Sequence, residues 1–374
     1  MNKKIGIITF HAAENFGSAL QAYALQKILQ GYGFDVYIID AILELDMQQY
    51  NVFRTYLYLE HPKNLVRDIL HFPYTKKRKT NFKMFKEQYM NLTPKKYNLG
   101  KDSLEELNSF FDIFVCGSDQ IWNLNCTNGF VPEFFLDFVK NDRKKISYAP
   151  SMPCEISPQY YEKVRRSINR IDHVSVREKQ TVKYLCESLK IDKSISTVLD
   201  PTLLLNKNNY INEFKLVEDN KKYIFVYMLY DENKGQMDKV IDLALDLSKN
   251  KKLNIKYVYM NKIKKLKNAE FVLGIGPKEF LEMIYNAEYV ITNSFHATIF
   301  SILFEKSFCV IKRIGSQSRM IELLRMIKME KNLYSDSTSG WTMSKVQDDN
   351  MFLLNTEKKK SRLFLEKALE ITID

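Results

Sequence analysis

Short apolar, β-branched segments alternate with segments of helical periodicity along almost the whole chain, and this alternation constrains the fold most. Residues 4–10 form the first such strand, followed by a helical pattern and then by a second strand at residues 34–39. Strand–helix–strand units of this kind build parallel sheets covered by helices on both faces. Further strands are expected at residues 111–115, 145–149, 173–176, 223–229, 255–259, 289–292 and 307–311. The sequence therefore predicts an α/β protein with two doubly wound, Rossmann-like domains that face a cleft.

Changes of character along the chain indicate where these domains begin and end. Residues 1–205 are assigned to an N-terminal domain, in which an aromatic, basic segment at about residues 41–101 is interpreted as inserted helices. Residues 206–222 are polar and without clear periodicity, so they are interpreted as a linker. Residues 221–355 are assigned to the C-terminal domain. Residues 356–374 form a terminal helix that can pack back on the first domain.

The cysteines and the apolar runs indicate a cytoplasmic protein. No apolar run approaches the roughly eighteen residues that span a bilayer, and the chain enters a strand within a few residues of Met1, which argues against a secretory signal. The five cysteines are scattered, odd in number and contain no CxxC pair. Reduced thiols and the absence of a zinc site are therefore expected.

The charge of the chain favours anionic partners. Its 56 lysines and arginines exceed its 45 acidic residues, which gives a net charge of +11. Much of this charge lies in residues 76–96 and 249–267, and solvated helix faces explain such runs. For Lys76, Lys77, Arg78 and Lys79, the alternative is peripheral contact with an anionic membrane face. No helix-turn-helix, zinc-finger or RNP pattern is present, so nucleic acid is not an expected partner.

Residues 287–302 place a histidine where a strand ends and a helix begins. A buried strand is followed by the polar break Thr292-Asn293-Ser294 and then by apolar residues at helical spacing. Ligands of open parallel sheets bind beyond the carboxyl ends of the strands, and the first turn of a helix favours an anion. Asn293 or Ser294 is expected to cap this turn. His296 is therefore either a proton donor beside an anion or a partly buried structural histidine.

The first domain also offers polar residues at predicted strand ends, including Gly117, Ser118, Asp119 and Arg177. Ser18 and Gln21 match a capping box that would open the first helix, and Gly17 before it permits close approach of a ligand. No GxGxxG loop indicates a nucleotide cofactor, and no clustered carboxylates indicate a metal. Because arginines bind carboxylate and phosphate through two parallel hydrogen bonds, the residues favour metal-independent group transfer from a small anionic donor.

Five motifs occur in order along the chain: Asn15-Phe-Gly17-Ser-Ala-Leu-Gln21, Gly117-Ser-Asp119-Gln-Ile-Trp122, Ser175-Val-Arg177-Glu178, Asp200-Pro-Thr202 and Thr292-Asn-Ser294-Phe-His296-Ala-Thr298. In these motifs the sequence resembles the polysaccharide pyruvyl transferase family, whose members have a glycosyltransferase-B-like fold. The resemblance implies phosphoenolpyruvate as donor substrate, with no cofactor. It implies as acceptor two hydroxyls of one hexose in a capsular or other surface polysaccharide, or in its lipid-linked precursor. It also implies that His296 delivers a proton and that Arg177 holds the charge of the donor.

One position departs from the family pattern. Many members have an arginine two residues before the histidine, whereas this chain has Ser294. Arg313 and Arg319 are the candidates to replace it. The departure keeps open a metal-independent glycosyltransferase that uses a sugar nucleotide, and a non-catalytic subunit that binds a sugar or lipid phosphate. The expected substrate-binding residues are Asn15, Gly17, Gly117, Ser118, Asp119, Asn293, Ser294, Arg313 and Arg319.

Overall fold

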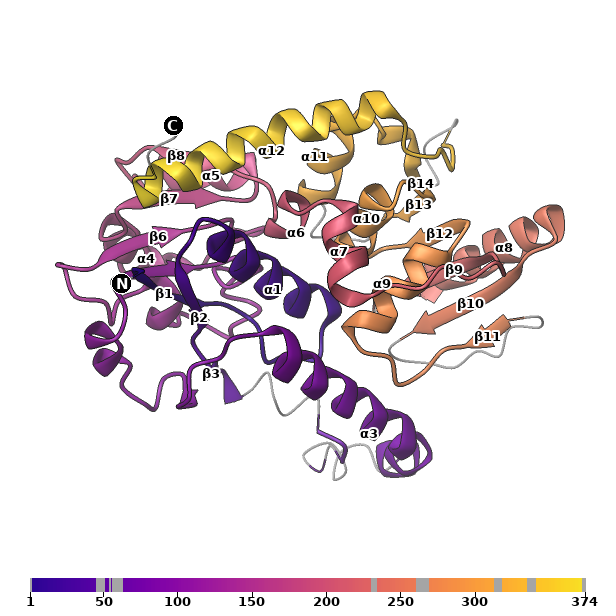
Figure 1. Cartoon of the computed structure of the whole chain (residues 1–374), viewed down its shortest axis with the longest axis horizontal. Coiled ribbons are helices and arrows are strands. Elements are labelled where there is room, and N and C mark those ends of the chain that lie inside the picture. Colours follow the sequence, from indigo (N-terminus) through magenta and orange to yellow (C-terminus); the bar gives the residue numbers. More distant parts are fainter. Residues whose placement is uncertain are drawn as a thin grey trace. The chain divides into compact units, whose positions relative to one another are not determined.

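The chain forms two compact units, each built around a parallel sheet (Figure 1). The computed structural model describes residues 2–44, 51–53, 55, 63–229, 234–259, 269–312, 318–334 and 341–371. Unit 1 comprises Met1–Leu205 and Glu357–Asp374, and unit 2 comprises Asn206–Thr356. Among the described residues, each sheet has six strands. The predicted α/β fold with two doubly wound sheets is thus confirmed.

In unit 1 the strand order is β2-β1-β5-β6-β7-β8, with parallel pairing throughout. The strands are β1 Lys4–Ile8, β2 Asp35–Ile38, β5 Ile113–Cys116, β6 Lys144–Ser147, β7 His173–Val176 and β8 Ile195–Thr197. From β1 the chain first builds toward β2, and later returns to the other side of β1 with β5. The switch point lies between β1 and β5, whose register pairs Ile8 with Cys116. In sheets of this type, ligands bind at the carboxyl ends of the strands beside such a switch point.

Unit 2 repeats this topology with the order β11-β10-β9-β12-β13-β14. The strands are β9 Tyr223–Met228, β10 Asn254–Tyr259, β11 Ala269–Phe271, β12 Tyr289–Thr292, β13 Ser307–Ile311 and β14 Leu333–Tyr334. Here the switch point lies between β9 and β12. The core of the sheet is apolar and fully buried, as shown by Ile224, Val226 and Ile291. Strands covered on both faces are near-continuous apolar runs, which is why the sequence revealed them.

Helices cover both sheets and supply the turns at their carboxyl ends. Those of unit 1 are α1 Phe16–Gly31, α3 Lys63–Tyr89, α4 Tyr161–Asn169, α5 Lys179–Glu187 and α6 Pro201–Leu204. Those of unit 2 are α7 Lys207–Phe214, α8 Lys234–Lys251, α9 Pro277–Asn286, α10 Phe295–Leu303 and α11 Ser318–Met326. Short 3-10 helices are η2 Glu105–Ser109, η3 Pro132–Phe135, η4 Pro158–Tyr160 and η5 Glu330–Asn332. No helix among the described residues is long and apolar enough to cross a membrane.

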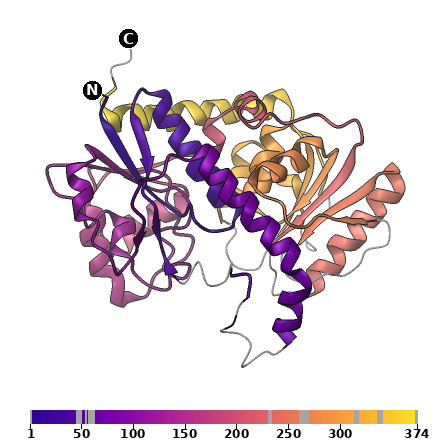
Figure 2. The ribbon, with the colours of Figure 1, turned by 60° about the horizontal axis from the view of Figure 1, so that its bottom comes forward.

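The segment at residues 41–101 contains strands as well as a helix, which differs from the interpretation as helices alone. Two short strands, β3 Ala41–Ile42 and β4 Tyr97–Asn98, pair in parallel on either side of α3 in the sequence. The second half of α3 packs on α1 through stacked Phe82 and Phe16 rings, whose centroids are 5.5 Å apart. Figure 2 shows α3 as one long helix whose first turns extend away from the sheet of unit 1.

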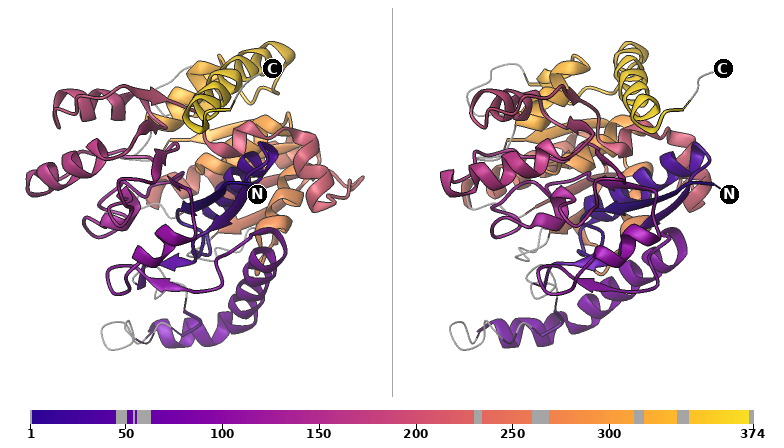
Figure 3. Two further views of the ribbon diagram at one scale, coloured as in Figure 1. Left: turned by 60° about the vertical axis from the view of Figure 1, so that its left-hand side comes forward. Right: turned by 90° about the vertical axis from the view of Figure 1, so that its left-hand side faces the viewer.

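Two further segments differ from their interpretations. Residues 206–222 follow the division between the units, as expected of a linker, but they contain a helix: α7 begins there with a capping box in which Asn206 and Asn209 bond each other's backbone at 2.9 and 2.8 Å. The last helix, α12 Asp348–Leu369, begins earlier than residue 356 (Figure 3). From Glu357 onward it belongs to unit 1, where Ser361 Oγ accepts a hydrogen bond from the Leu199 N–H at 2.9 Å.

Candidate functional site

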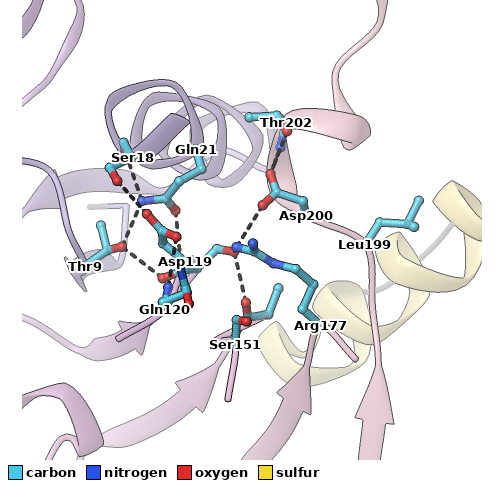
Figure 4. Close-up of polar contacts among 12 residues, drawn as sticks. Thr9, Ser18, Gln21, Asp119, Gln120, Ser151, Arg177, Leu199, Asp200 and Thr202 are labelled. Atoms are coloured by element: carbon cyan, nitrogen blue, oxygen red, sulfur yellow. Dashed lines mark hydrogen bonds and ion pairs between the residues drawn. The ribbon is translucent and has the colours of Figure 1, made fainter. Parts of the chain in front are cut away.

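The switch point of unit 1 carries a buried cluster of hydrogen-bonded polar side chains (Figure 4). Gln21, on α1, lies at its centre. Its Nε2 donates to Thr9 Oγ1 at 2.9 Å and to the Phe10 carbonyl at 3.1 Å, while its Oε1 accepts from the Ser118 N–H at 3.1 Å. Thr9 Oγ1 in turn donates to the Ser118 carbonyl at 3.1 Å. One glutamine thus fixes the ends of β1 and β5 relative to α1.

This use of Gln21 corrects the predicted capping box. Helix α1 begins at Phe16, and its N-cap is Asn15, whose Oδ1 accepts from the Gly17 N–H at 2.9 Å and the Ser18 N–H at 3.3 Å. Gly17 therefore lies inside the first helical turn rather than in a loop. Ser18 Oγ donates to Asp119 Oδ2 at 2.6 Å. Asn15 and Gly17 order the start of α1, while Ser18 and Gln21 reach the turn after β5.

The turn after β5 requires glycine at its first position. Gly117 has φ +116°, and a Cβ there would lie 2.1 Å from the Tyr148 carbonyl oxygen. The Gly117–Ser118 peptide bond is cis, and Asp119 has φ +66°. Asp119 Oδ1 accepts from the Gln120 N–H at 2.9 Å. The expected substrate-binding residues Gly117, Ser118 and Asp119 thus form one buried turn.

Arg177 follows β7, and its guanidinium joins two of the sequence motifs to this turn. Its Nη2 lies 2.8 Å from Asp200 Oδ2 and donates to Ser118 Oγ at 2.5 Å. Asp200 is the N-cap of α6, and its Oδ1 accepts from the N–H and the Oγ1 of Thr202 at 2.9 and 2.6 Å. The sequence singled out Arg177 for an anionic ligand. In the structure its guanidinium faces a buried carboxylate of the same unit.

Sequence reasoning missed the roles of two buried carboxylates in unit 1. In the sequence, Asp200 and Glu178 occur in two of the five motifs, and neither is predicted to be a site residue. Glu178 is fully buried, and its Oε1 accepts from Ser151 Oγ at 2.5 Å. The signal that was available is the type of residue: a carboxylate just beyond a buried strand needs a nearby donor or cation.

His11 and Asp40 form a second polar pair at the ends of β1 and β2. His11 Nε2 lies 3.0 Å from Asp40 Oδ1, and His11 Nδ1 lies 3.2 Å from the Thr9 carbonyl oxygen. Burial raises the pKa of Asp40, but the hydrogen bond and charge of His11, together with Lys96 and Lys86, outweigh it and lower that pKa below its ordinary value. The Asp40 carboxylate therefore stays ionised in mildly acidic solution.

In unit 2, His296 lies in the first turn of α10, directly beyond β12. Ser294 is the N-cap, and its Oγ accepts from the Ala297 N–H at 3.4 Å. The Ser294 N–H donates to Thr292 Oγ1 at 3.0 Å. Asn293 does not cap the helix. Its Oδ1 instead accepts from the Leu229 N–H at 2.7 Å, which ties β12 to the end of β9.

One of the two candidate arginines lies beside this helix start. The Arg319 guanidinium carbon is 5.1 Å from the centroid of the Phe295 ring, and the Phe295 and His296 ring centroids are 5.5 Å apart. Helix α11, which carries Arg319, also contacts α10 where Thr298 Oγ1 lies 3.7 Å from Met320 Sδ. Arg313 lies outside the described residues. The structure thus places Arg319 against Phe295, the residue between Ser294 and His296 in the chain.

These two clusters suit different tasks. The unit 1 cluster is a closed network of hydrogen bonds around one ion pair. The unit 2 cluster places an imidazole, 8% exposed, in a helical first turn whose Phe295 ring contacts the Arg319 guanidinium. Helix N-termini attract anions through their unpaired N–H groups and dipole. Within the described ranges, no three His, Cys, Asp or Glu side chains gather in a group that would hold a metal.

Comparison with known proteins gives one family and a set of distant structures. A family model described as polysaccharide pyruvyl transferase matches residues 15–313. No curated protein sequence matches the chain. Similar solved structures include a UDP-GlcNAc 2-epimerase from Methanocaldococcus jannaschii, with 13% identity, 98% of this chain and 99% of that chain covered, and a TM-score of 0.47. A UDP-N-acetylglucosamine 2-epimerase from Rickettsia bellii has 11% identity, coverage of 99% and 96%, and a TM-score of 0.47. A glycosyltransferase from Streptomyces nogalater has 9% identity, coverage of 99% and 99%, and a TM-score of 0.43.

Proposed function

Because the chain belongs to the polysaccharide pyruvyl transferase family, we propose that it transfers the pyruvyl group of phosphoenolpyruvate to a sugar. The acceptor is one hexose of a surface or capsular polysaccharide, or of its lipid-linked precursor, and the product is a cyclic ketal. Phosphoenolpyruvate serves as donor substrate, and no cofactor takes part.

The observation that carries this proposal is the position of His296. It combines a strand end at a switch point with the first turn of a helix, and Arg319 contacts Phe295 in that same turn. An anionic donor bound at this turn would meet the helix N–H groups and Arg319.

The reaction balances without a further reactant. His296 delivers a proton to the methylene carbon of phosphoenolpyruvate, which makes the neighbouring carbon electrophilic. One sugar hydroxyl adds to that carbon, and the bond between the carbon and the phosphate oxygen breaks to release inorganic phosphate. The second hydroxyl then adds and closes the ketal. Of the two hydroxyl protons, one leaves with the phosphate and one restores His296.

Arg319 is proposed to supply the positive charge that many family members place at position 294. Ser294 is committed to capping α10, and an arginine side chain has no acceptor oxygen with which to replace that cap. The contact between Arg319 and Phe295 supports this assignment, since it holds a guanidinium next to the same helical turn.

Arg177 is proposed as the donor-binding cation of unit 1. Its partner Asp200 fixes the plane of the guanidinium, as carboxylates commonly do for functional side chains. Asp200 also balances part of the charge, so the contribution of Arg177 to donor binding is smaller than that of an isolated cation.

The test combines turnover with donor binding. His296→Asn keeps hydrogen-bonding capacity and loses the proton, so release of phosphate from phosphoenolpyruvate with a panel of hexosides should fall by about 10²–10⁴. Donor affinity, measured by calorimetry, should change little. His173→Asn, at another partly buried histidine, is the matched control and should keep parent turnover. Parent turnover in His296→Asn would refute the acid assignment.

A second part of the test asks whether Arg319 binds the donor. Arg319→Leu should weaken phosphoenolpyruvate binding by roughly 10- to 100-fold, because a charge-assisted hydrogen bond is lost. Arg325→Leu, on the exposed side of the same helix, is its control. Thermal stabilisation by sugar nucleotides, with none by phosphoenolpyruvate, would favour a glycosyltransferase instead. Stabilisation by plain phosphate alone, with no turnover on any acceptor, would favour a non-catalytic binding subunit.

A further inference from the structure

Helix α3 has an apolar side that faces solvent. Its buried residues are Asp68, Phe82 and Phe85, and only the latter two pack on α1. Its first half instead exposes a run of large apolar side chains, which we call the α3 apolar face. The exposed fractions are 41% for Leu65, 60% for Val66, 55% for Ile69, 70% for Leu70 and 39% for Phe72. Exposed apolar groups of this size usually mark an interaction surface.

Helical geometry places these side chains together. Residues three and four apart lie on one side of a helix, so Leu65, Ile69 and Phe72 line up, with Val66 and Leu70 beside them. Phe53, which is also exposed, stacks on Phe72 with ring centroids 5.8 Å apart and widens the patch. The polar side chains of this half, such as Asp68, lie on the opposite, less exposed side. The usual polarity of a surface helix is therefore inverted here.

Lysines continue the same exposed side directly after the apolar face. Lys76 and Lys77 are exposed, and Lys76 Nζ lies 6.0 Å from the centroid of the Phe72 ring. Arg78 and Lys79, in contrast, turn inward to Glu14, at 2.8 and 3.4 Å. The four-residue basic run thus divides into two residues that are exposed and two that hold α3 to unit 1.

We propose that the α3 apolar face inserts into the surface of an anionic lipid bilayer, with Lys76 and Lys77 at the level of the headgroups. At 1.5 Å per residue, the two lysines lie about 10 Å along the helix axis from Ile69 and Leu70. Interfacial helices lie in the plane of the membrane and bury their apolar side to a depth of roughly 5–10 Å, so lysines next to the apolar residues can reach the headgroups. Lysine stems that cover apolar surface while their ammonium groups reach the headgroups are typical of such helices.

The positive charge of the chain favours an anionic lipid bilayer, and not a second copy of the chain, as the partner of the α3 apolar face. A symmetric contact through the α3 apolar face would bring the exposed lysines of two copies together, in a protein with a net charge of +11. Anionic headgroups would neutralise the same lysines, and each lysine near such a surface strengthens binding roughly fivefold. The inference stands on α3 alone and does not require the proposed function, although a lipid-linked acceptor would lie at this surface.

The experiment is vesicle flotation with the full chain. Binding to mixed phosphatidylcholine–phosphatidylglycerol vesicles is expected at low salt, and much weaker binding to phosphatidylcholine alone. Ile69→Ser/Leu70→Ser should weaken it about 100-fold, since each change removes a large apolar side chain from the lipid. Lys76→Ser/Lys77→Ser should weaken it roughly 25-fold at low salt.

Matched controls remove the same groups elsewhere. Phe352→Ser deletes an apolar side chain that is 72% exposed, and Lys163→Ser/Lys249→Ser removes two exposed lysines. Both should bind vesicles as the parent does. Unchanged flotation of Ile69→Ser/Leu70→Ser would overturn the proposal. The proposal would also be overturned if the parent chain floated with neither kind of vesicle and formed a dimer that Ile69→Ser/Leu70→Ser dissociates. Turnover with a soluble acceptor should stay at the parent level in every variant, which separates this outcome from failure of the proposed function.

Discussion

Replacing Asp200 with asparagine is expected to destabilise unit 1 by about 3 kcal/mol. The side chains of Arg177 and Asp200 are 3% and 0% exposed and lie 2.8 Å apart. Removing one member of a buried ion pair costs about 3–5 kcal/mol, because the remaining charge loses its counter-charge in a medium of low dielectric constant. Asparagine keeps the Oδ1 acceptor, so the bonds from Thr202 survive and the change isolates the charge. We therefore expect the lower end of that range.

The assay must report unit 1 separately, because two units need not unfold in one transition. The two tryptophans make this feasible. Trp122 is fully buried in unit 1, with its ring stacked 5.2 Å from Phe135, whereas Trp341 lies in unit 2. In a Trp341→Phe background, fluorescence during urea unfolding follows unit 1. A fall of about 3 kcal/mol would appear as a lower midpoint at an unchanged slope.

Two further variants test the reasoning. Glu187→Gln removes one member of the exposed pair with Lys183, at 3.9 Å, and should cost less than about 0.5 kcal/mol. Asp200→Asn/Arg177→Met removes both charges, so its cost should be at least about 2 kcal/mol less than the sum of the single changes. A midpoint for Asp200→Asn no lower than that of Glu187→Gln would refute the argument, and so would strict additivity in the double variant.

Two other predictions follow from local geometry and charge. Gly117→Ala should destabilise unit 1 by about 3–5 kcal/mol in the same assay, because its Cβ would meet the Tyr148 carbonyl and its φ of +116° disfavours side chains. Burial, followed by repulsion from neighbouring lysines, lowers the pKa of Lys306 from 10.5 to about 8. Between those pH values the unfolded chain binds more protons, so the stability of unit 2 should rise with pH by about 1–2 kcal/mol after allowance for screening. In Lys306→Met this rise, followed by Trp341 fluorescence in a Trp122→Phe background, should disappear.

Several buried strands could be predicted closely from the sequence. The bounds of β7, β12 and β13 agree with prediction, because each contains buried β-branched residues and charged or polar residues lie directly beyond its ends. The short edge strands β11 and β14 were missed. Two or three residues carry no periodicity, and only the neighbouring strand decides that they pair.

In the candidate site, too, local sequence patterns do not show which distant side chains and backbone groups meet. The positions of Ser118 and Arg177 at predicted strand ends indicated one region, and the structure joins them, together with Asp200, in one network. Local rules failed for Gln21, since a serine three residues before a glutamine satisfies the capping pattern whether or not the side chain caps the helix. Its actual partner, the Ser118 N–H, lies on another strand turn, and sequence spacing contains no signal for that contact.

The ion pair also determines how the role of Arg177 can be decided. A purely structural arginine and a donor-binding arginine both lose function when they are replaced, so variants at Arg177 itself discriminate poorly. Asp200→Asn distinguishes the two roles, because each role predicts a different direction for the change in phosphoenolpyruvate affinity. If Arg177 binds the donor, removing the neighbouring negative charge should strengthen phosphoenolpyruvate binding, by roughly fivefold for a charge several ångströms from the ligand. If Arg177 only holds Ser118 and α6 in place, the loosened network should leave donor affinity unchanged or weaken it. The proposed role of Arg177 requires the first outcome, and calorimetry at a temperature where unit 1 of the variant remains folded would measure it.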